Sequence, residues 1–397
     1  MKDFVFEYPI KVVFGHDAEV QAGPEAARLG GKKALIHHDS GAYLEESGLL
    51  PRVRKSLEDA GLTVVELGGV RPNPRLSLMR EGIKLAKEEG IDVVVGIGGG
   101  SVLDSSKTIA VGAKYDGDVW DFATFKAQIK DRLPIIAINT MSGTGSETSI
   151  CAMVVNDEGE KEDKRGLFGM EVLPNVALIN PALQFSLPPK QVASGAMDII
   201  SHTLTTWFTE TEGVYLTDRL AEGLIETVLK YGPLALRDPE DYNARAQIAA
   251  SAALAVVLMV GYDREGRDIC HGLENPVTTM HLLAHGTGLA IMYPAWMKMT
   301  YKRDLPRFVQ FANRLMGVPV DPYDPEGVAW QGILRFESFI KDQLGLPTRM
   351  KDIGIHDKTD IEMLADRATQ NGTQTMGAGK YALTRDEVLE LYKMTLE

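Results

Sequence analysis

The stretch Ile91–Lys107, IDVVVGIGGGSVLDSSK, decides the fold of this chain. It opens with a run of apolar, mostly β-branched residues, which predicts a buried strand. The glycines Gly98, Gly99 and Gly100 follow at once, and the residues after them have the spacing of a helix. A strand, a glycine-rich turn and a helix in this order are typical of a parallel α/β sheet, in which ligands bind at the carboxyl ends of the strands.

Apolar runs of the same kind recur on both sides of this stretch, up to about residue 185. Amphipathic segments separate them, and this alternation predicts a parallel sheet covered by helices. A second loop of small and polar residues, NTMSGTGSE at 139–147, follows one run and is expected at the same sheet edge. The other predicted strands are KALIHH at 33–38, LTVVEL at 62–67, LPIIAI at 133–138 and NVALIN at 175–180.

The pattern changes to long helical periodicity after Leu187-Pro188-Pro189. Thr384 and Glu387 have capping-box spacing and predict the start of the last helix. Because 397 residues exceed the size of one typical hydrophobic core, we predict two domains, an α/β domain over 1–185 and an all-helical domain over 186–397. The clearest helical stretches are 191–208, 219–232, 243–259 and 328–345.

Composition and charge narrow the function classes. Apolar residues make up 44% and charged residues 24%, as in ordinary globular proteins. A net charge of −13 without a Lys/Arg cluster argues against nucleic acid or a membrane surface as partner, which leaves a small molecule. The segment MKDFVFEYPI does not read as a signal peptide, no apolar run approaches 20 residues, and Cys151 and Cys270 are the only cysteines, so we expect a soluble, cytoplasmic protein.

Asp198 and His202 lie four residues apart in SGAMDIISHTL. On a helix they share one face, with Cβ atoms about 5–6 Å apart, so both side chains could reach one cation. A surface ion pair is the commoner use of this spacing.

Three of the eight histidines fall within the next candidate segment, CHGLENPVTTMHLLAHGTG. In one straight helix His271 and His285 would stand about 21 Å apart. Pro276 argues against a straight helix, so the chain could fold back there and bring these two together. The rival interpretations are the i, i+4 pair of His281 and His285, and histidines that merely pack or cap helix ends. The sequence alone leaves the three open.

The glycine-rich turn is a candidate phosphate site. It opens a helix, whose first backbone N–H groups and positive end would face a phosphate. It lacks the Lys-Ser/Thr of a Walker loop and matches G-x-G-x-x-G only in part, because Ser101 stands where the last glycine should be. A purely structural turn is the alternative.

Four motifs in this order, GGGSVLDSSK, TMSGTGSE, the helical D-x3-H after LPPKQVASGAMD, and H-x13-H ending in AHGTGLA, resemble the iron-containing (group III) alcohol dehydrogenases, most closely their NADH-dependent butanol dehydrogenase branch. The similarity extends from Phe4 to the C-terminus. The resemblance implies a dehydroquinate synthase-like fold: a dinucleotide-binding α/β domain, an all-helical metal-binding catalytic domain, and an active site between them. It also implies a homodimer or larger assembly.

The resemblance also implies specific site residues and cofactors. The metal, Fe2+ or Zn2+, would be held by Asp198, His202, His271 and His285, with His281 as a nearby pocket residue. Relatives often carry a second histidine where this chain has Asn275, so any role of that histidine in binding nicotinamide or relaying a proton cannot be carried over, and His281 is the candidate substitute. The implied nucleotide contacts are Asp39, Asn73, Gly98, Gly99, Gly100, Ser101, Asp104, Thr140, Ser142, Thr144 and Lys164.

The predicted function is hydride transfer between NAD(H) and a small primary alcohol or aldehyde. Asp39 would set the preference for NAD(H) over NADP(H), because a carboxylate binds the ribose hydroxyls and repels a 2′-phosphate. Its alternative role is to cap the turn before Ser40-Gly41. The competing functions are a dehydroquinate synthase-like NAD/metal cyclase, which would use Glu where Asp198 stands and needs basic residues for its substrate, and a non-catalytic nucleotide-binding protein.

Overall fold

A computed structural model describes residues 3–396 except 159–161, 258–268, 282 and 357. The chain divides into two compact units. One is Glu7–Ser186, and the other combines Leu187–Glu397 with Met1–Phe6. None of the helices described is long and apolar enough to cross a bilayer.

The first unit is built on a six-stranded, wholly parallel sheet. Its strands are ordered β1-β8-β5-β4-β2-β3, so the chain moves to one side after β2 and to the other after β4. This reversal is the switch point at which doubly wound sheets bind ligands, outside the carboxyl ends of β2 and β4. The strands are β1 (Lys11–Phe14), β2 (Lys33–His38), β3 (Thr63–Leu67), β4 (Val93–Gly98), β5 (Ile135–Asn139) and β8 (Val176–Ile179).

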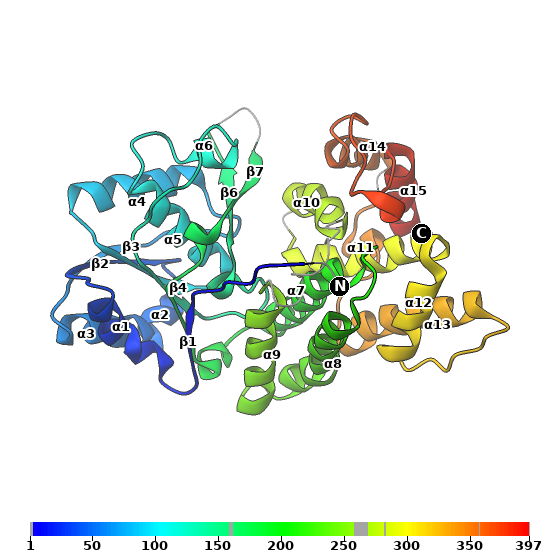
Figure 1. Cartoon of the computed structure of the whole chain (residues 1–397), viewed down its shortest axis with the longest axis horizontal. Coiled ribbons are helices and arrows are strands. Elements are labelled where there is room, and N and C mark those ends of the chain that lie inside the picture. The colour runs from blue at the N-terminus through cyan, green and yellow to red at the C-terminus, as the bar shows by residue number, and fades with distance from the viewer. Residues whose placement is uncertain (1–2, 159–161, 258–268, 282, 357, 397) are drawn as a thin grey trace. The chain divides into compact units, whose positions relative to one another are not determined.

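Both faces of the central strands are buried, and successive residues of β4 alternate between two apolar cores. Val93 and Val95 pack with helices α1 (Ala22–Arg28) and α3 (Leu49–Asp59), whereas Val94 packs with α4 (Leu76–Glu88) and α5 (Gly100–Gly112) on the opposite face (Figure 1). Two-sided burial explains why these strands read as continuous apolar runs. The remaining helices of the unit are α2 (Ala42–Glu46) and α6 (Trp120–Ala123).

A hairpin of β6 (Cys151–Asn156) and β7 (Asp163–Phe168) lies outside the main sheet. Buried Lys107 ties α5 to the chain entering β6. Its ammonium donates to Ser146 Oγ at 2.9 Å and to the carbonyl oxygens of Ser149 and Cys151 at 3.1 and 2.9 Å. Neither β1 nor this hairpin was among the strands predicted from the sequence.

The second unit is helical around one large apolar core. Arg307 anchors the end of α7, the first helix of this unit. Its guanidinium lies 3.7 Å from the centroid of the Trp207 ring and donates to both carboxylate oxygens of Asp218. The predicted capping box is formed, since the Thr384 amide donates to Glu387 at 2.8 Å. The helices are α7 (Pro189–Trp207), α8 (Tyr215–Arg237), α9 (Tyr242–Ala255), α10 (Ile269–His281), α11 (His285–Thr300), α12 (Leu305–Arg314), α13 (Pro325–Ser338), α14 (Lys358–Ala368) and α15 (Arg385–Leu396).

The expected chain reversal at Pro276 is wrong. Pro276 lies inside α10, and the helix continues to His281. A proline within a helix costs about 3 kcal/mol. Ile269, Leu273 and Val277 are almost completely buried along one face of α10, and their packing offsets that cost. The reversal comes after His281 instead, with Ala284 in an extended conformation immediately before α11.

His37 makes the stability of the first unit depend on pH. It is fully buried, with Nδ1 2.8 Å from the Leu67 carbonyl oxygen and Nε2 2.8 Å from Ser105 Oγ. Burial lowers the pKa of His37 to about 4. From its ordinary value near 6.5 down to about 4, the unfolded chain therefore binds a proton that the folded protein excludes, and stability falls by about 3 kcal/mol as the pH is lowered through this window.

We predict that His37→Asn removes this part of the acid sensitivity. The variant is less stable at pH 7.5, but its free energy of unfolding falls less between pH 6.5 and 4 than that of the wild type. Reversible urea unfolding at several pH values measures the difference, in which contributions from the other histidines cancel. An equal loss in both proteins would contradict the role given to His37.

Candidate functional site

Helix α7 presents the first two predicted metal ligands on one face. Asp198 and His202 are one turn apart, and Nε2 of His202 lies 3.3 Å from Oδ1 of Asp198. The helix starts at Pro189, in the first turn, where a proline costs no hydrogen bond. The helical prediction and the shared face are both confirmed.

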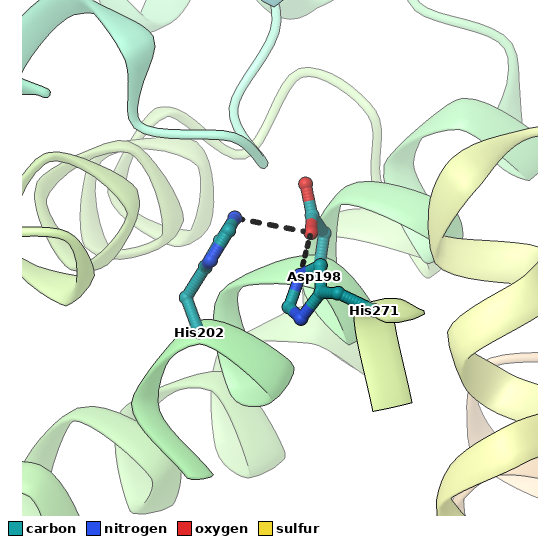
Figure 2. Close-up of side chains that lie close together, drawn as sticks. All are labelled: Asp198, His202 and His271. Atoms are coloured by element: carbon teal, nitrogen blue, oxygen red, sulfur yellow. Dashed lines mark ion pairs between the residues drawn. The ribbon is translucent and has the colours of Figure 1, made fainter. Parts of the chain in front are cut away.

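Helices α10 and α11 bring the other two predicted ligands to the same carboxylate. His271 lies in the first turn of α10, and its Nε2 is 3.9 Å from Asp198 Oδ1 (Figure 2). His285 is the first residue of α11, and its Nε2 is 3.5 Å from the same oxygen. The His271 ring lies 4.8 Å from the His202 ring and 5.1 Å from the His285 ring, between centroids. Side chains from three helices thus converge on one oxygen atom.

The spacing of these atoms fits a metal centre better than a hydrogen-bonded cluster. The three separations of 3.3, 3.5 and 3.9 Å exceed the usual 2.7–3.2 Å of a hydrogen bond. A tetrahedral ion with bonds of about 2.0–2.2 Å sets its ligand atoms about 3.3–3.6 Å apart. The separations of His202 and His285 from Asp198 fall in this range, and that of His271 is longer. Asp198 Oδ1 is buried and accepts no well-aligned hydrogen bond from the described residues, as expected of an atom reserved for a cation.

The site is closed on one side and open on the other. Burial alone would raise the pKa of Asp198, but the charges of His202, His285 and His271 outweigh it and hold the pKa well below its usual range. The Asp198 side chain is 5% exposed, whereas those of His202 and His285 are 25% and 32% exposed. An anchored carboxylate with partly exposed imidazoles leaves room for a further ligand at the outer side.

Two glycines after His285 allow the helices to approach closely enough. A Cβ at Gly286 would lie 1.9 Å from the carbonyl oxygen of Ser194, so α11 could not pack against α7 here with any larger residue. A Cβ at Gly288 would lie 2.8 Å from Oε2 of Glu274 on α10. The motif AHGTG is therefore a packing requirement of the cluster as well as the source of one of its histidines.

His281 is placed apart from the cluster. It ends α10, whereas His285 begins α11, so the two do not form an i, i+4 pair on one helix. His281 lines a separate cavity of about 420 Å3 with Ile355, His356 and Asp360 among its neighbours. Within the described residues, the group that could hold a metal contains Asp198, His202 and His271, and it includes neither His281 nor the predicted ligand His285.

Glu274 is a residue of this site that the sequence analysis missed. It is fully buried on α10, one turn after His271, and its Oε1 lies 2.6 Å from Nδ1 of His285. The available signal was an acidic residue three positions after a candidate ligand, on the apolar face of a helix.

The predicted phosphate loop lies where β4 passes into α5. Gly99 precedes the helix and Gly100 begins it, with the amides of Val102 and Leu103 bonded to the Gly99 carbonyl. A Cβ at Gly100 would lie 2.4 Å from Oγ1 of Thr144, so the glycine lets the two predicted cofactor loops touch. The helix start, Gly100 and Ser101 included, is thus placed to receive an anion.

The other predicted nucleotide residues fall into two groups. Asp39, Asn73, Thr140, Ser142 and Thr144 follow strands β2, β3 and β5 at the carboxyl edge of the sheet, and Asn73 has a left-handed backbone with φ of 58°. Lys164 lies on β7 and belongs to the hairpin.

The carboxylate of Asp104 already has protein partners. It accepts hydrogen bonds from Ser146 Oγ at 2.6 Å and from the Met153 amide at 3.0 Å. Burial raises the pKa of Asp104, against the charges of Lys107 and Lys164. Asp104 therefore joins α5 to the second loop and to β6.

Asp39 caps the turn that follows β2, as its alternative interpretation proposed. Its Oδ1 accepts from the Gly41 amide at 2.8 Å, and its Oδ2 accepts from the Tyr43 hydroxyl at 3.0 Å. Tyr43 also contacts Thr140. Because a carboxylate has about four acceptor positions, these contacts leave two for a ribose.

Comparison with known proteins assigns the whole chain. The family model for iron-containing alcohol dehydrogenase matches residues 9–181, and that for the C-terminal part of the Fe-containing alcohol dehydrogenase family matches 192–396. The chain belongs to the iron-containing alcohol dehydrogenase family. It is therefore an oxidoreductase, and the resemblance inferred from the four sequence motifs is confirmed.

Similar proteins from this family cover the chain from end to end. NADH-dependent butanol dehydrogenase A of Clostridium acetobutylicum is 33% identical over 99% of each chain. A probable NADH-dependent butanol dehydrogenase 1 of Bacillus subtilis is 35% identical over 100% of each. The crystal structure of NADH-dependent butanol dehydrogenase A from Thermotoga maritima has a TM-score of 0.93 and 35% identity, covering 100% of this chain and 99% of that one. The predicted fold class, an α/β unit followed by a helical one, is confirmed.

Proposed function

We propose that this chain interconverts small primary alcohols and aldehydes, of about the size of butanol, using NAD(H) and one divalent metal ion. The observation that carries the proposal is the convergence of three imidazole nitrogens on the buried Oδ1 of Asp198, within a family of alcohol dehydrogenases. The butanol dehydrogenases similar to it support the substrate size and the use of NADH.

Asp198, His202, His271 and His285 would hold the ion. One carboxylate and three imidazoles without a thiolate suit Fe2+ or Zn2+. When bound, the ion supplies Lewis acidity that polarises the oxygen of the substrate, and NADH supplies the hydride.

The residues of the chain bind and orient these groups. Buried Asp198 stays anionic, and the low exposure of His271 excludes water from the inner side. Partly exposed His202 and His285 line the side from which a small substrate can enter. In the other unit, the amides at the start of α5 would receive the pyrophosphate of the dinucleotide. No side-chain nucleophile is needed for hydride transfer.

Domain roles, cellular location and assembly complete the proposal. We assign dinucleotide binding to residues 1–185 and metal binding to 186–397. A cytoplasmic location rests on the sequence pattern. We also propose that the chain forms a homodimer or larger homo-oligomer. The outer edge of β1 carries partly exposed Val12 and Phe14, and such an edge strand can pair with that of a second copy.

An isotope-transfer assay tests this function. We predict that metal-reconstituted protein with NADH deuterated at both C4 positions transfers one deuterium directly to the carbonyl carbon of butanal. Asp198→Ala and His271→Ala should lose the metal and at least about 1000-fold in kcat/KM together, an effect of the size expected for removing a catalytic metal. Butanol without deuterium at that carbon, or full turnover by metal-free protein, would refute the mechanism.

The same assay separates the alternatives. A dehydroquinate synthase-like cyclase returns its NAD unchanged and would not consume NADH with a simple aldehyde. A non-catalytic nucleotide-binding protein would bind NADH and metal without turnover.

We predict a preference for NADH over NADPH that depends on Asp39. A carboxylate at the end of β2 accepts hydrogen bonds from ribose hydroxyls and repels a 2′-phosphate, an effect on the order of 1.5–3 kcal/mol or roughly 10- to 150-fold in selectivity. The ratio of kcat/KM for the two cofactors at pH 7.5 measures it in wild type and Asp39→Gly. Because Asp39 also caps its turn, Tyr43→Phe serves as the control: it removes the hydroxyl contact to Asp39 and leaves the charge. An unchanged ratio in Asp39→Gly would show that this carboxylate does not choose the cofactor.

A further inference from the structure

We propose that Glu274 is a positioning residue for the metal centre: its carboxylate accepts a hydrogen bond from Nδ1–H of His285 and thereby fixes the imidazole with Nε2 toward the ion. This inference rests on the proposed ligand set. The two ring nitrogens of His285 face two different carboxylates. Nε2 lies 3.5 Å from Asp198 Oδ1, and Nδ1 lies 2.6 Å from Glu274 Oε1.

The chemistry of a histidine ligand requires such a partner. A neutral imidazole that binds a metal through Nε2 carries its proton on Nδ1. An acceptor at Nδ1 holds that tautomer, restrains rotation of the ring and makes Nε2 a stronger donor to the ion. Glu274 Oε1 is at the distance of a charge-assisted hydrogen bond, although the N–H direction is not aligned with it.

Burial makes any other role for Glu274 costly. Its side chain is fully buried, and neither carboxylate oxygen accepts a well-aligned hydrogen bond from the described residues. An isolated carboxylate in such a place costs several kcal/mol, so it needs a nearby positive charge. A bound cation, acting through the neutral imidazole of His285, supplies that charge. The two carboxylates, Asp198 and Glu274, then balance a divalent ion among three neutral imidazoles.

The packing around Glu274 keeps its carboxylate in place. Gly288 on α11 leaves the space that Oε2 occupies, since a Cβ there would lie 2.8 Å from that oxygen and 2.5 Å from Cγ2 of Thr278. From α15, Tyr392 donates from its hydroxyl to the Leu273 carbonyl at 2.7 Å, which fixes the turn of α10 that carries Glu274.

The test measures metal affinity, which a general packing role would not change. Purified wild type, Glu274→Gln and Glu274→Ala are stripped of metal, and the dissociation constants for Zn2+ and Co2+ are determined by competition with a chromophoric chelator. Glutamine keeps an acceptor oxygen but loses the charge, whereas alanine loses both. We expect affinity to fall from wild type to Gln to Ala, by about 10- to 100-fold for Ala, with an altered visible spectrum of the Co2+-loaded variants.

Glu222→Gln is the matched control, because Glu222 is also fully buried but bonds to Arg314 and Gln310 of α12, outside the metal ligands. It should bind Zn2+ as wild type does, even where its thermal stability is lower. If Glu274→Ala does not fold, the comparison of Glu274→Gln with wild type decides. Equal affinities and spectra in wild type and the Glu274 variants, or an equal loss in Glu222→Gln, would overturn the role of Glu274 alone. A wild type that binds no divalent ion would overturn the proposed metal centre as well.

Discussion

The buried carboxylate oxygen of Asp198 is the atom around which the helical unit is organised. Three imidazoles from three helices stand 3.3–3.9 Å from it, and a bound cation would offset the cost of gathering these polar groups. Other contacts keep the three helices together. The absence of a side chain at Gly286 lets α11 pack against α7, and Arg307 holds the end of α7 against α8. Function and packing therefore depend on the same helix contacts.

In the α/β unit, the main constraint is that the loops after the parallel strands must pack together at one edge of the sheet. Its strands are parallel, so every loop after a strand arrives at one edge, and Gly100 lets the loops after β4 and β5 touch. Buried Lys107 and partly buried Asp104 then tie the helix between those loops to the hairpin. The edge becomes a rigid, amide-rich surface of the kind that binds a dinucleotide phosphate.

Periodicity and spacing predicted much of this arrangement, and their failures have physical causes. The five long strand signals and the shared face of Asp198 and His202 depend on local repeats, which a sequence displays directly. His271 and His285 meet only through tertiary packing, so residue spacing left them undecided until the resemblance of the motifs was used. Pro276 was given too much weight because buried contacts of α10 outweigh its cost. Glu274 was missed because no local sequence pattern shows which ring a buried acidic side chain will contact. Strand β1 was missed because four partly exposed residues carry a weak strand pattern.

The most direct test of the central claim is X-ray absorption spectroscopy at the metal edge of protein loaded with one equivalent of Zn2+. The account predicts a first shell of nitrogen and oxygen only, at about 2.0–2.2 Å, with the outer-shell scattering of three imidazole rings. A sulfur scatterer at about 2.3 Å would place Cys270, the neighbour of His271, in the centre, and a shell without imidazole scattering would place the ion elsewhere. Either result would contradict an ion held by Asp198, His202, His271 and His285.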